Sequence, residues 1–429
     1  MFKRILTLGA GIVLGLALAA GGARMAAAWG WLPNRDLNRS MDYLRDIAQM
    51  VSENYVDADA ARYDRLAKAA AHGLVESLDP HSEFLEERDY AELEEELSGD
   101  FSGIGIQVEL RKGRVLVIAP IANSPAERAG IQHGDEILGV DGRALEKGVT
   151  LDGVTDRLRG KPKTSVTIDF HRPATGRKFQ LTLQREMIAM ESVRGATVLP
   201  DRIGYIQVTE FSDHTGDDFR NALDALLRQD IDGLIIDLRN NPGGLLDAAV
   251  EVAEPFFKKD ELVVSTRGRK PEDNEEYRAE LDGEPLTLPV AVLINAGTAS
   301  AAEVVTGALK DTGRAVIVGE RSFGKGSVQS IIKLKHGEGL RLTTAKYYTP
   351  GGVSIHAKGI APDVDVVLTP DDDSKLQVQQ TRSDIADPKE FQERFGFAPI
   401  ADRQLAAALA VLQGVNLLEE RRETVALAR

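Results

Sequence analysis

Residues 297–329 read GTASAAEVVTGALKDTGRAVIVGERSFGKGSVQ, and this stretch decides which fold and chemistry the chain can have. An apolar run, Val290–Ile294, leads into Gly-Thr-Ala-Ser300, and a second, Ala315–Val318, leads into a turn that ends in Phe-Gly-Lys325. Short apolar runs that alternate with helices are typical of the buried strands of an α/β domain. Each turn therefore presents one side chain capable of catalysis.

Ser300 fits two roles. The sequence Ser300-Ala-Ala-Glu303 at a strand-to-helix junction matches a capping box, which predicts a purely structural N-cap. The same place suits a nucleophile, because the N–H of Ala301 and the positive end of the helix can stabilise an oxyanion. Both hypotheses predict the same local geometry, so the choice between them depends on the base.

Lys325 is the candidate base. The chain has 7 histidines, and none lies in a motif that suggests a Ser-His-Asp arrangement; His81 and His356 are isolated and are interpreted as structural or solvent-facing. A lysine can act as a base when burial lowers its pKa toward neutrality, since desolvation disfavours the ammonium. The neighbours of Lys325 are Phe323 and two glycines, which favour such burial. Ser-Lys pairs are an attested variant of the catalytic triad.

Several other function classes are excluded. Residues 319–325 match the P-loop pattern up to the lysine, but the next residue is Gly326 where magnesium binding needs Ser or Thr, and Ser327 comes one position late. The net charge of -15 disfavours a nucleic-acid partner. Cys is absent, which removes thiolate chemistry. We expect no metal and no cofactor.

The 429 residues are enough for two or three domains. Residues 1–31 are predicted to be a targeting segment, because a basic start precedes the uncharged apolar run Ile5–Ala20. Two outcomes stay open: cleavage as a signal peptide near residues 26–28, or retention as a membrane anchor. Either predicts an exported protein, periplasmic and, if the segment is retained, tethered to the inner membrane.

The remaining chain divides into regions with different sequence patterns. Residues 37–100 show helical periodicity, and their acidic stretch Glu86–Glu96 is interpreted as a solvated helix face or as a charged gate or docking surface. Residues 101–185 are rich in short β-type runs, and residues 186–370 alternate strands with helices. Within residues 186–370 we expect 267–280 to be a surface loop or flap. For residues 371–429 we predict a flexible linker, to about 389, followed by a helix over 403–414.

Residues 101–185 resemble a PDZ domain of the bacterial protease type. The features are a Gly-rich loop, a short helix with a Ser124 cap and a Gly130 stop, and an Asp-Gly turn at 141–142. The resemblance implies a binding site for a polypeptide C-terminus, with backbone N–H groups from Gly103, Ile104, Gly105 and Ile106 facing the carboxylate. The side chains of Ile104 and Ile106 would line the pocket for the terminal side chain of this ligand. The alternative is that these glycines form a tight loop and the isoleucines belong to the core.

The whole stretch 38–370 resembles the carboxyl-terminal processing proteases, the tail-specific Ser-Lys peptidases. The motifs that carry the resemblance include Gly-Thr-Ala-Ser300-Ala-Ala-Glu, Phe-Gly-Lys325-Gly-Ser-Val-Gln329, Asp-Leu-Arg-Asn-Asn-Pro-Gly243-Gly244 and Tyr347-Tyr-Thr-Pro-Gly-Gly. The expected fold class is therefore α/β (multidomain α+β): a helical N-terminal region, a PDZ domain and an α/β Ser-Lys protease core with a parallel or mixed sheet. Thr298 stands where many relatives have Ser, outside the nucleophile position.

The resemblance also implies roles. Ser300 would be the nucleophile, Lys325 the general base and Gln329 a group that orients the lysine. The oxyanion hole would use the N–H groups of Ala301 and of Gly243 or Gly244, and Arg159 would couple the PDZ domain to the site, unless it is simply a solvated arginine.

The partners implied are protein substrates bound through their C-termini, with an activating partner protein and a homo-oligomer as further expectations. The competing hypothesis is a non-catalytic PDZ scaffold protein.

Overall fold

The computed structural model describes residues 34–427, apart from 122, 147, 383–384 and 386. The predicted targeting segment, 1–31, lies outside the described residues. The chain divides into two compact units, residues 1–84 and 85–429, and each is described by itself. In the part of the chain that the structure describes, no helix combines the length and hydropathy needed to cross a bilayer.

The N-terminal unit is helical, as predicted. It contains α2 (Arg35–Asn54) and α3 (Tyr63–Glu76), and the short strand β1 (Glu83–Leu85) lies at its end. The Asn34 side chain caps α2 by accepting a hydrogen bond from the Leu37 N–H at 3.1 Å. No residue of α2 is buried, and its large apolar side chains are exposed: Leu37, Met41, Tyr43, Ile47, Met50 and Val51.

The second unit starts with α4 (Glu87–Ser98) and continues into a small β-rich domain. Its main sheet has the order β3-β4-β5-β7-β8, with β6 beside β5, while β2 pairs with β9. The predicted Ser124 cap is confirmed, since its hydroxyl accepts the Glu127 N–H. The elements are β2 (Asp100–Gly103), β3 (Ile106–Arg111), β4 (Arg114–Pro120), α5 (Pro125–Arg128), β5 (Glu136–Val140), β6 (Arg143–Ala144), α6 (Leu151–Leu158), β7 (Ser165–Arg172), β8 (Arg177–Gln184) and β9 (Glu186–Ala189).

The rest of the unit is an α/β core around the sheet β10-β11-β12-β15-β16-β19, in which only the edge strand β10 is antiparallel to its neighbour. The predicted buried parallel strands are thus confirmed. The elements are β10 (Val193–Leu199), β11 (Ile203–Val208), α7 (Thr215–Leu227), β12 (Gly233–Asp237), α8 (Leu246–Ala253), β15 (Val290–Ile294), α9 (Ala301–Asp311), β16 (Ala315–Gly319) and β19 (Val364–Asp365).

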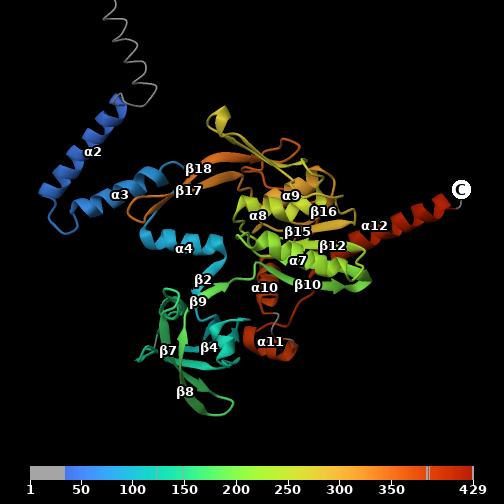
Figure 1. Cartoon of the computed structure of the whole chain (residues 1–429), viewed down its shortest axis with the longest axis horizontal. Helices are drawn as coiled ribbons and strands as arrows, with labels where there is room; N and C mark the ends of the chain where they lie inside the picture. The colour runs from blue at the N-terminus through green and yellow to red at the C-terminus, as the bar shows by residue number, and fades with distance from the viewer. Residues whose placement is uncertain (1–33, 122, 147, 383–384, 386, 428–429) are drawn as a thin grey trace, which may run out of the picture. The chain divides into compact units, whose positions relative to one another are not determined.

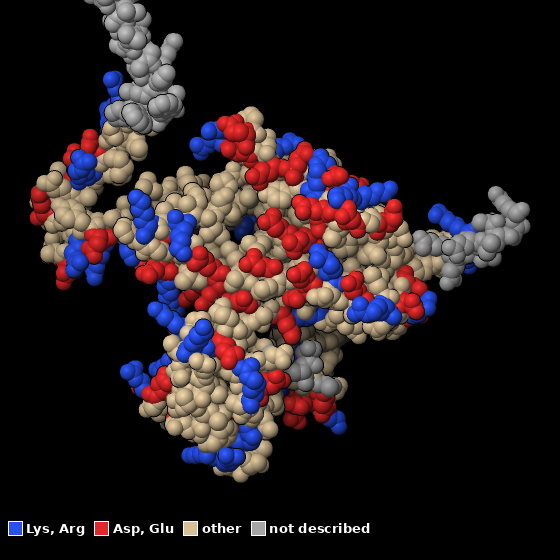
Figure 2. Space-filling view, viewed as in Figure 1, with Lys and Arg blue, Asp and Glu red and all other residues tan. Residues whose placement is uncertain are grey.

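Alternate residues of the strands face two separate cores, as the period of a strand requires. Ile236 and Val292 pack with α7, α8 and α9, whereas Ile235 and Leu293 pack with α12 (Arg403–Leu427). Figure 1 shows α12, in red, running from the sheet to the C-terminal end of the chain. On the face drawn in Figure 2, acidic side chains gather over α7 and α8, in keeping with the net charge of -15.

A second sheet carries one of the two turns of interest. Strand β18 (Gly339–Tyr348) lies between β17 (Ser327–Lys333) and β13 (Leu262–Gly268), and β14 (Glu275–Arg278) pairs with β13. Residues 267–280, predicted to be a surface loop or flap, do not form an irregular loop, because β13 and β14 form a hairpin there. Glu275 and Glu276 occupy its exposed edge strand, so the charges that favoured a loop remain in solvent.

The flexible linker predicted from residue 371 is also wrong. This stretch forms α10 (Pro370–Thr381) and α11 (Pro388–Phe395), and α12 extends to residue 427, beyond the helix expected over 403–414. The Thr369 side chain caps α10, and its three aspartates occupy the first turn, where negative charge is stabilised by the helix dipole. A run that looked like a solvated linker is therefore a helix N-terminus.

The helices α10 and α11 are fastened to the small domain through Glu109 of β3. Its carboxylate accepts hydrogen bonds from Arg382 and Arg394, both at 2.9 Å, and α11 lies beside this domain in Figure 1. Burial acts to raise the pKa of the Glu109 carboxyl, but the two arginines together hold it below its usual range. The stabilisation is present above the pKa of the unfolded carboxyl and is lost as the pH falls through the lowered pKa.

We therefore expect Glu109→Gln to weaken the docking of α10 and α11 by about 2 kcal/mol, because charged hydrogen bonds to two part-buried arginines are lost. Hydrogen exchange of residues 370–395 should rise in this variant at neutral pH, and in the wild type only in acid. Glu92→Gln, which removes an exposed ion pair with Arg88, is the control. Unchanged exchange in Glu109→Gln would contradict the prediction.

Candidate active site

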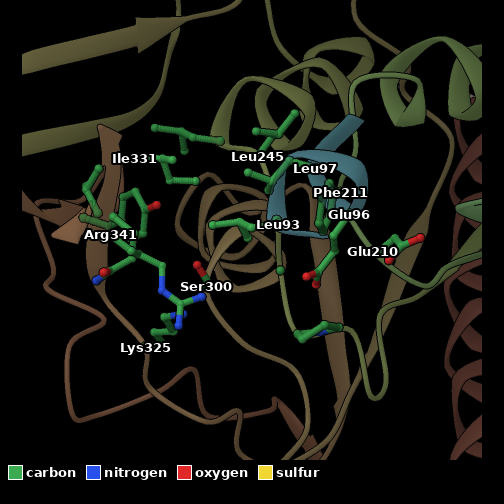
Figure 3. A pocket seen from close by; sticks show the side chains of 17 residues that line it. Leu93, Glu96, Leu97, Glu210, Phe211, Leu245, Ser300, Lys325, Ile331 and Arg341 are labelled. Carbon is green, nitrogen blue, oxygen red and sulfur yellow. The ribbon is translucent and has the colours of Figure 1, made fainter. Parts of the chain in front are cut away.

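The two predicted turns meet at one cavity. Ser300 follows β15 and starts α9, whereas Lys325 precedes β17. Both line a cavity of about 270 Å³, which Figure 3 shows from close by. The other lining residues are mainly apolar, with four charged or amide groups among them: Leu93, Glu96, Leu97, Glu210, Phe211, Pro242, Gly243, Gly244, Leu245, Leu246, Val328, Gln329, Ile331, Arg341 and Tyr347.

The backbone of Ser300 is held in an unusual conformation. Its φ of 55° and ψ of -118° lie outside the regions that a non-glycine residue prefers, and such strain is common at functional sites. Ser300 is the N-cap of α9, as predicted, and its N–H donates to the Glu303 carboxylate at 2.9 Å. The side chain is 7% exposed and lines the cavity, so the cap and the candidate nucleophile coincide.

The pKa of the Lys325 amine is lowered, which is the direction that a candidate base requires. Burial is the largest cause, the nearby charge of Arg341 adds to it, and Glu96 opposes it. The predicted source of the burial is wrong in one part: Phe323 is 63% exposed, so its ring faces solvent. Instead, the backbone of His356 packs against the turn, where a Cβ on Gly326 would lie 2.2 Å from the His356 nitrogen.

The candidate dyad is not joined by a hydrogen bond. Within the part of the chain that the structure describes, none links the Ser300 hydroxyl to the Lys325 amine or that amine to Gln329. The Gln329 amide donates to Thr343 at 2.8 Å and to Ser327 at 3.3 Å, and its buried carbonyl oxygen has no partner among the described residues. Gln329 thus lines the same cavity as Lys325 and has one acceptor available.

The candidate oxyanion donors differ in availability. The Gly243 N–H is donated to the Asn241 side chain at 2.8 Å. Among the described residues, the N–H groups of Gly244 and Ala301 have no acceptor, which favours these two. Gly243 is needed for a close approach, since a Cβ there would lie 2.7 Å from the Cβ of Ser300.

Arg341 and Tyr347 complete the cavity, and the sequence analysis predicted no site role for either, although Tyr347 begins one of the motifs that carry the family resemblance. Both lie on β18, on either side of an irregularity in its pairing with β17, and both line the cavity. In Figure 3 the Arg341 guanidinium lies close to Ser300 and Lys325. Burial raises the pKa of Tyr347 to about 12, and the neighbouring Ser300 side chain opposes this rise. Tyr347 is therefore a neutral hydroxyl beside Ser300 at neutral pH.

The acidic helix α4 also contributes to the cavity. Leu93, Glu96 and Leu97 line it, and in Figure 3 Glu96 lies across the cavity from Lys325. The exposed acidic residues of α4 agree with the predicted solvated face, while Glu96 agrees with a charged element at a site. Burial raises the pKa of the nearby Glu210 carboxyl, and the charge of Glu96 adds to this effect.

The residues predicted to bind a substrate tail lie in the small domain. Gly103 ends β2, and Gly105 has a φ of 73°, as a tight loop requires. Ile104 is 1% exposed and belongs to the domain core, which agrees with the alternative of a core isoleucine and not with a side chain that lines a pocket. Ile106 lines a separate surface cavity with Phe101 and Pro120.

Arg159, at the end of α6, is close to both the small domain and α4. It forms an ion pair with Glu95 of α4 at 3.5 Å, and it lies 5.2 Å from the centre of the Phe101 ring. Its side chain is 41% exposed. Arg159 therefore touches the helix whose next residue, Glu96, lines the cavity.

Comparison with known proteins places this site in a family. The model of peptidase family S41 matches residues 202–366. The carboxy-terminal-processing protease of Bartonella bacilliformis is 36% identical over 370 residues, which cover 85% of this chain and 82% of the relative. The chain belongs to the carboxy-terminal processing proteases of peptidase family S41. CtpB of Bacillus subtilis, another such protease, is 33% identical over 361 residues, covering 83% of this chain and 74% of CtpB.

Membership of family S41 agrees with the domain arrangement. A PDZ domain model matches residues 102–183, so the small β-rich domain of this S41 protease is a PDZ domain. Among solved structures, the photosystem II D1 C-terminal processing protease aligns with a TM-score of 0.44 and 31% identity, covering 75% of this chain and 92% of that one. The matches to the PDZ and S41 family models confirm the multidomain fold class expected from the sequence.

Proposed function

We propose that this S41 protease is a serine endopeptidase that cleaves exported proteins at or near their C-termini through a Ser300–Lys325 dyad. The observation that carries the proposal is the shared cavity. A strained serine at a helix N-terminus lines it together with a lysine whose pKa is lowered by burial. These are the two properties that a Ser-Lys peptidase needs.

The proposed reaction is acyl transfer. Neutral Lys325 accepts the proton of the Ser300 hydroxyl as its oxygen attacks the scissile carbonyl, and the ammonium then gives a proton to the leaving amine. The N–H groups of Ala301 and Gly244 stabilise the oxyanion. Water releases the acyl group, with Lys325 again as the base. Gln329 orients the lysine by accepting a hydrogen bond on its side-chain oxygen.

The direct test is cleavage of a peptide or unfolded protein by the full chain, with Ser300→Ala beside the wild type. Loss of all cleavage and of labelling by a fluorophosphonate in Ser300→Ala is the expected result. A non-catalytic PDZ scaffold would give equal and negligible cleavage by both proteins, and an activating partner added to the assay distinguishes a silent enzyme from a scaffold. Equal, substantial cleavage by both would remove Ser300 from the mechanism.

The charge of Arg341 has a consequence for pH dependence. Only the neutral amine of Lys325 accepts a proton, so activity falls as the pH drops through its pKa. Arg341→Gln removes a positive neighbour and should raise that pKa, which moves the acidic limb of kcat/KM to higher pH. Arg341→Lys keeps the charge and should keep the limb in place. An unchanged limb in Arg341→Gln would show that the guanidinium does not act on Lys325.

Substrate capture completes the proposal. The PDZ loop at Gly103–Ile106 would bind the tail of a protein substrate, and Arg159 would couple it to the site through Glu95, an idea that their ion pair supports.

Export to the periplasm, tethering by the N-terminal segment and an activating partner are parts of the same proposal. Assembly into a homo-oligomer is supported by the exposed apolar residues of α2.

A further inference from the structure

The Glu303 side chain joins the two turns that carry the proposed dyad. It is fully buried, and each of its two carboxylate oxygens accepts two hydrogen bonds. Oε1 accepts from the Ser322 hydroxyl at 2.5 Å and from the Gly324 N–H at 2.7 Å. Oε2 accepts from the Ser300 N–H at 2.9 Å and from the Lys325 N–H at 2.8 Å.

One atom therefore holds the backbone amides of Ser300 and Lys325 together. The two residues are 25 positions apart in the chain and belong to turns after neighbouring strands, β15 and β16. A capping box explains only the bond from Ser300, and the three bonds from 322–325 are additional. Burial raises the pKa of the Glu303 carboxyl, while all four hydrogen bonds act to lower it, so its burial is offset by a full set of donors.

We propose that Glu303 is a positioning residue for proteolysis, which sets the distance between the Ser300 and Lys325 side chains by fixing their backbone amides on one oxygen. The inference rests on the dyad proposed above. Its physical basis is that a proton transfer requires the donor and acceptor within hydrogen-bond reach, and that a misplacement of about 1 Å can cost about 100-fold in rate. Glu303 touches no substrate in this role.

Glu303→Gln is the sharpest variant, because it keeps the shape and replaces one oxygen by an NH₂ group. If that group takes the place of Oε2, the amides of Ser300 and Lys325 lose their acceptor. If it takes the place of Oε1, the amide of Gly324 loses its acceptor instead. The turn before β17 is disturbed in both orientations, since it contains both Gly324 and Lys325.

The test measures kcat per active site in the full chain, with active sites counted by stoichiometric fluorophosphonate labelling. A purely structural loss reduces the number of sites that can be labelled and leaves kcat per site unchanged. We expect Glu303→Gln to lower kcat per site by about 100-fold with little change in KM, and Glu303→Asp, whose carboxylate is one methylene shorter, to be impaired as well.

Glu254→Gln is the matched control. Glu254 is also a buried glutamate of the core, 6% exposed, and it accepts the Glu280 N–H at 2.6 Å, but it does not line the cavity of Ser300. This variant should lose stability while its kcat per site stays within about twofold of the wild type. A Glu303→Gln enzyme with fewer sites but wild-type kcat per site would overturn the inference. Absence of cleavage by the wild type, also with an activating partner added, would instead overturn the proposed function.

Discussion

Replacing Lys325 with methionine should lower kcat/KM by about 10³-fold or more while KM changes little, because the variant loses the proposed base and keeps the apolar stem of the side chain. Arginine at the same position should be just as inactive, since a guanidinium stays charged at every accessible pH. Both variants should still fold, since Lys325 lies at the cavity and its amine forms no hydrogen bond with the other described residues. The measurement is steady-state cleavage with circular dichroism as the check on folding.

The pH dependence of kcat/KM in the wild type is a second test of Lys325 as the base. The charged groups that face Lys325 are Arg341 on β18, which lowers its pKa after burial, and Glu96 on α4, which raises it. The pKa lies below the ordinary 10.5 of a lysine, so the acidic limb of kcat/KM should lie below that value and no activity should return at low pH. Lys346→Met, at an exposed position of β18, is the control. More than a tenth of wild-type activity in Lys325→Met would exclude the lysine as the base.

The sequence could bring Ser300 and Lys325 to one candidate site because the relevant signals are local. Strand ends deliver Ser300 and Lys325 to turns, and a turn needs only a few neighbouring residues to be recognised. The same holds for the Ser124 cap and the parallel strands, whose continuous apolar runs have few other structural uses. The link between the two turns through Glu303 could be predicted only in part from the sequence. Glu303 fits a local capping box, whereas its hydrogen bonds to residues 322–325 depend on the packing of β15 beside β16.

The residues that alter the electrostatics of the cavity could not be predicted from the sequence, for a similar reason. Arg341 and Tyr347 follow an ordinary strand pattern, and nothing local shows that β18 lies beside β17 and thus beside Lys325. For the three aspartates after Pro370, the prediction of a flexible linker was wrong for the opposite reason, because it used composition and overlooked local signals. Their composition is that of a linker, but a Thr cap and a proline at the first turn make the same charges favourable in a helix. Composition was the weaker signal there.

The largest loss of stability is expected from Arg239→Met. The guanidinium is almost fully buried and is shared by the carboxylates of Asp237 and Asp402, while Tyr205 donates to Asp237 at 2.8 Å. Removing the arginine leaves Asp237, which is 0% exposed, without its countercharge. Breaking a buried pair in this way costs about 3–5 kcal/mol. Urea unfolding of the full chain should show a shift of this size.

The control separates this buried cluster from an ordinary ion pair. Arg202→Met removes an arginine that makes two short hydrogen bonds to Asp232, at 2.8 and 2.7 Å. The two side chains are 63% and 41% exposed, so the expected loss of folding free energy is below about 1 kcal/mol. Asp402 also caps α12 by accepting the Leu405 N–H, so Arg239 ties the start of that helix to the loop that leads to Gly243 and Gly244. Arg239→Met should therefore increase hydrogen exchange in both segments. Equal shifts in the two arginine variants would contradict a special role for the buried cluster.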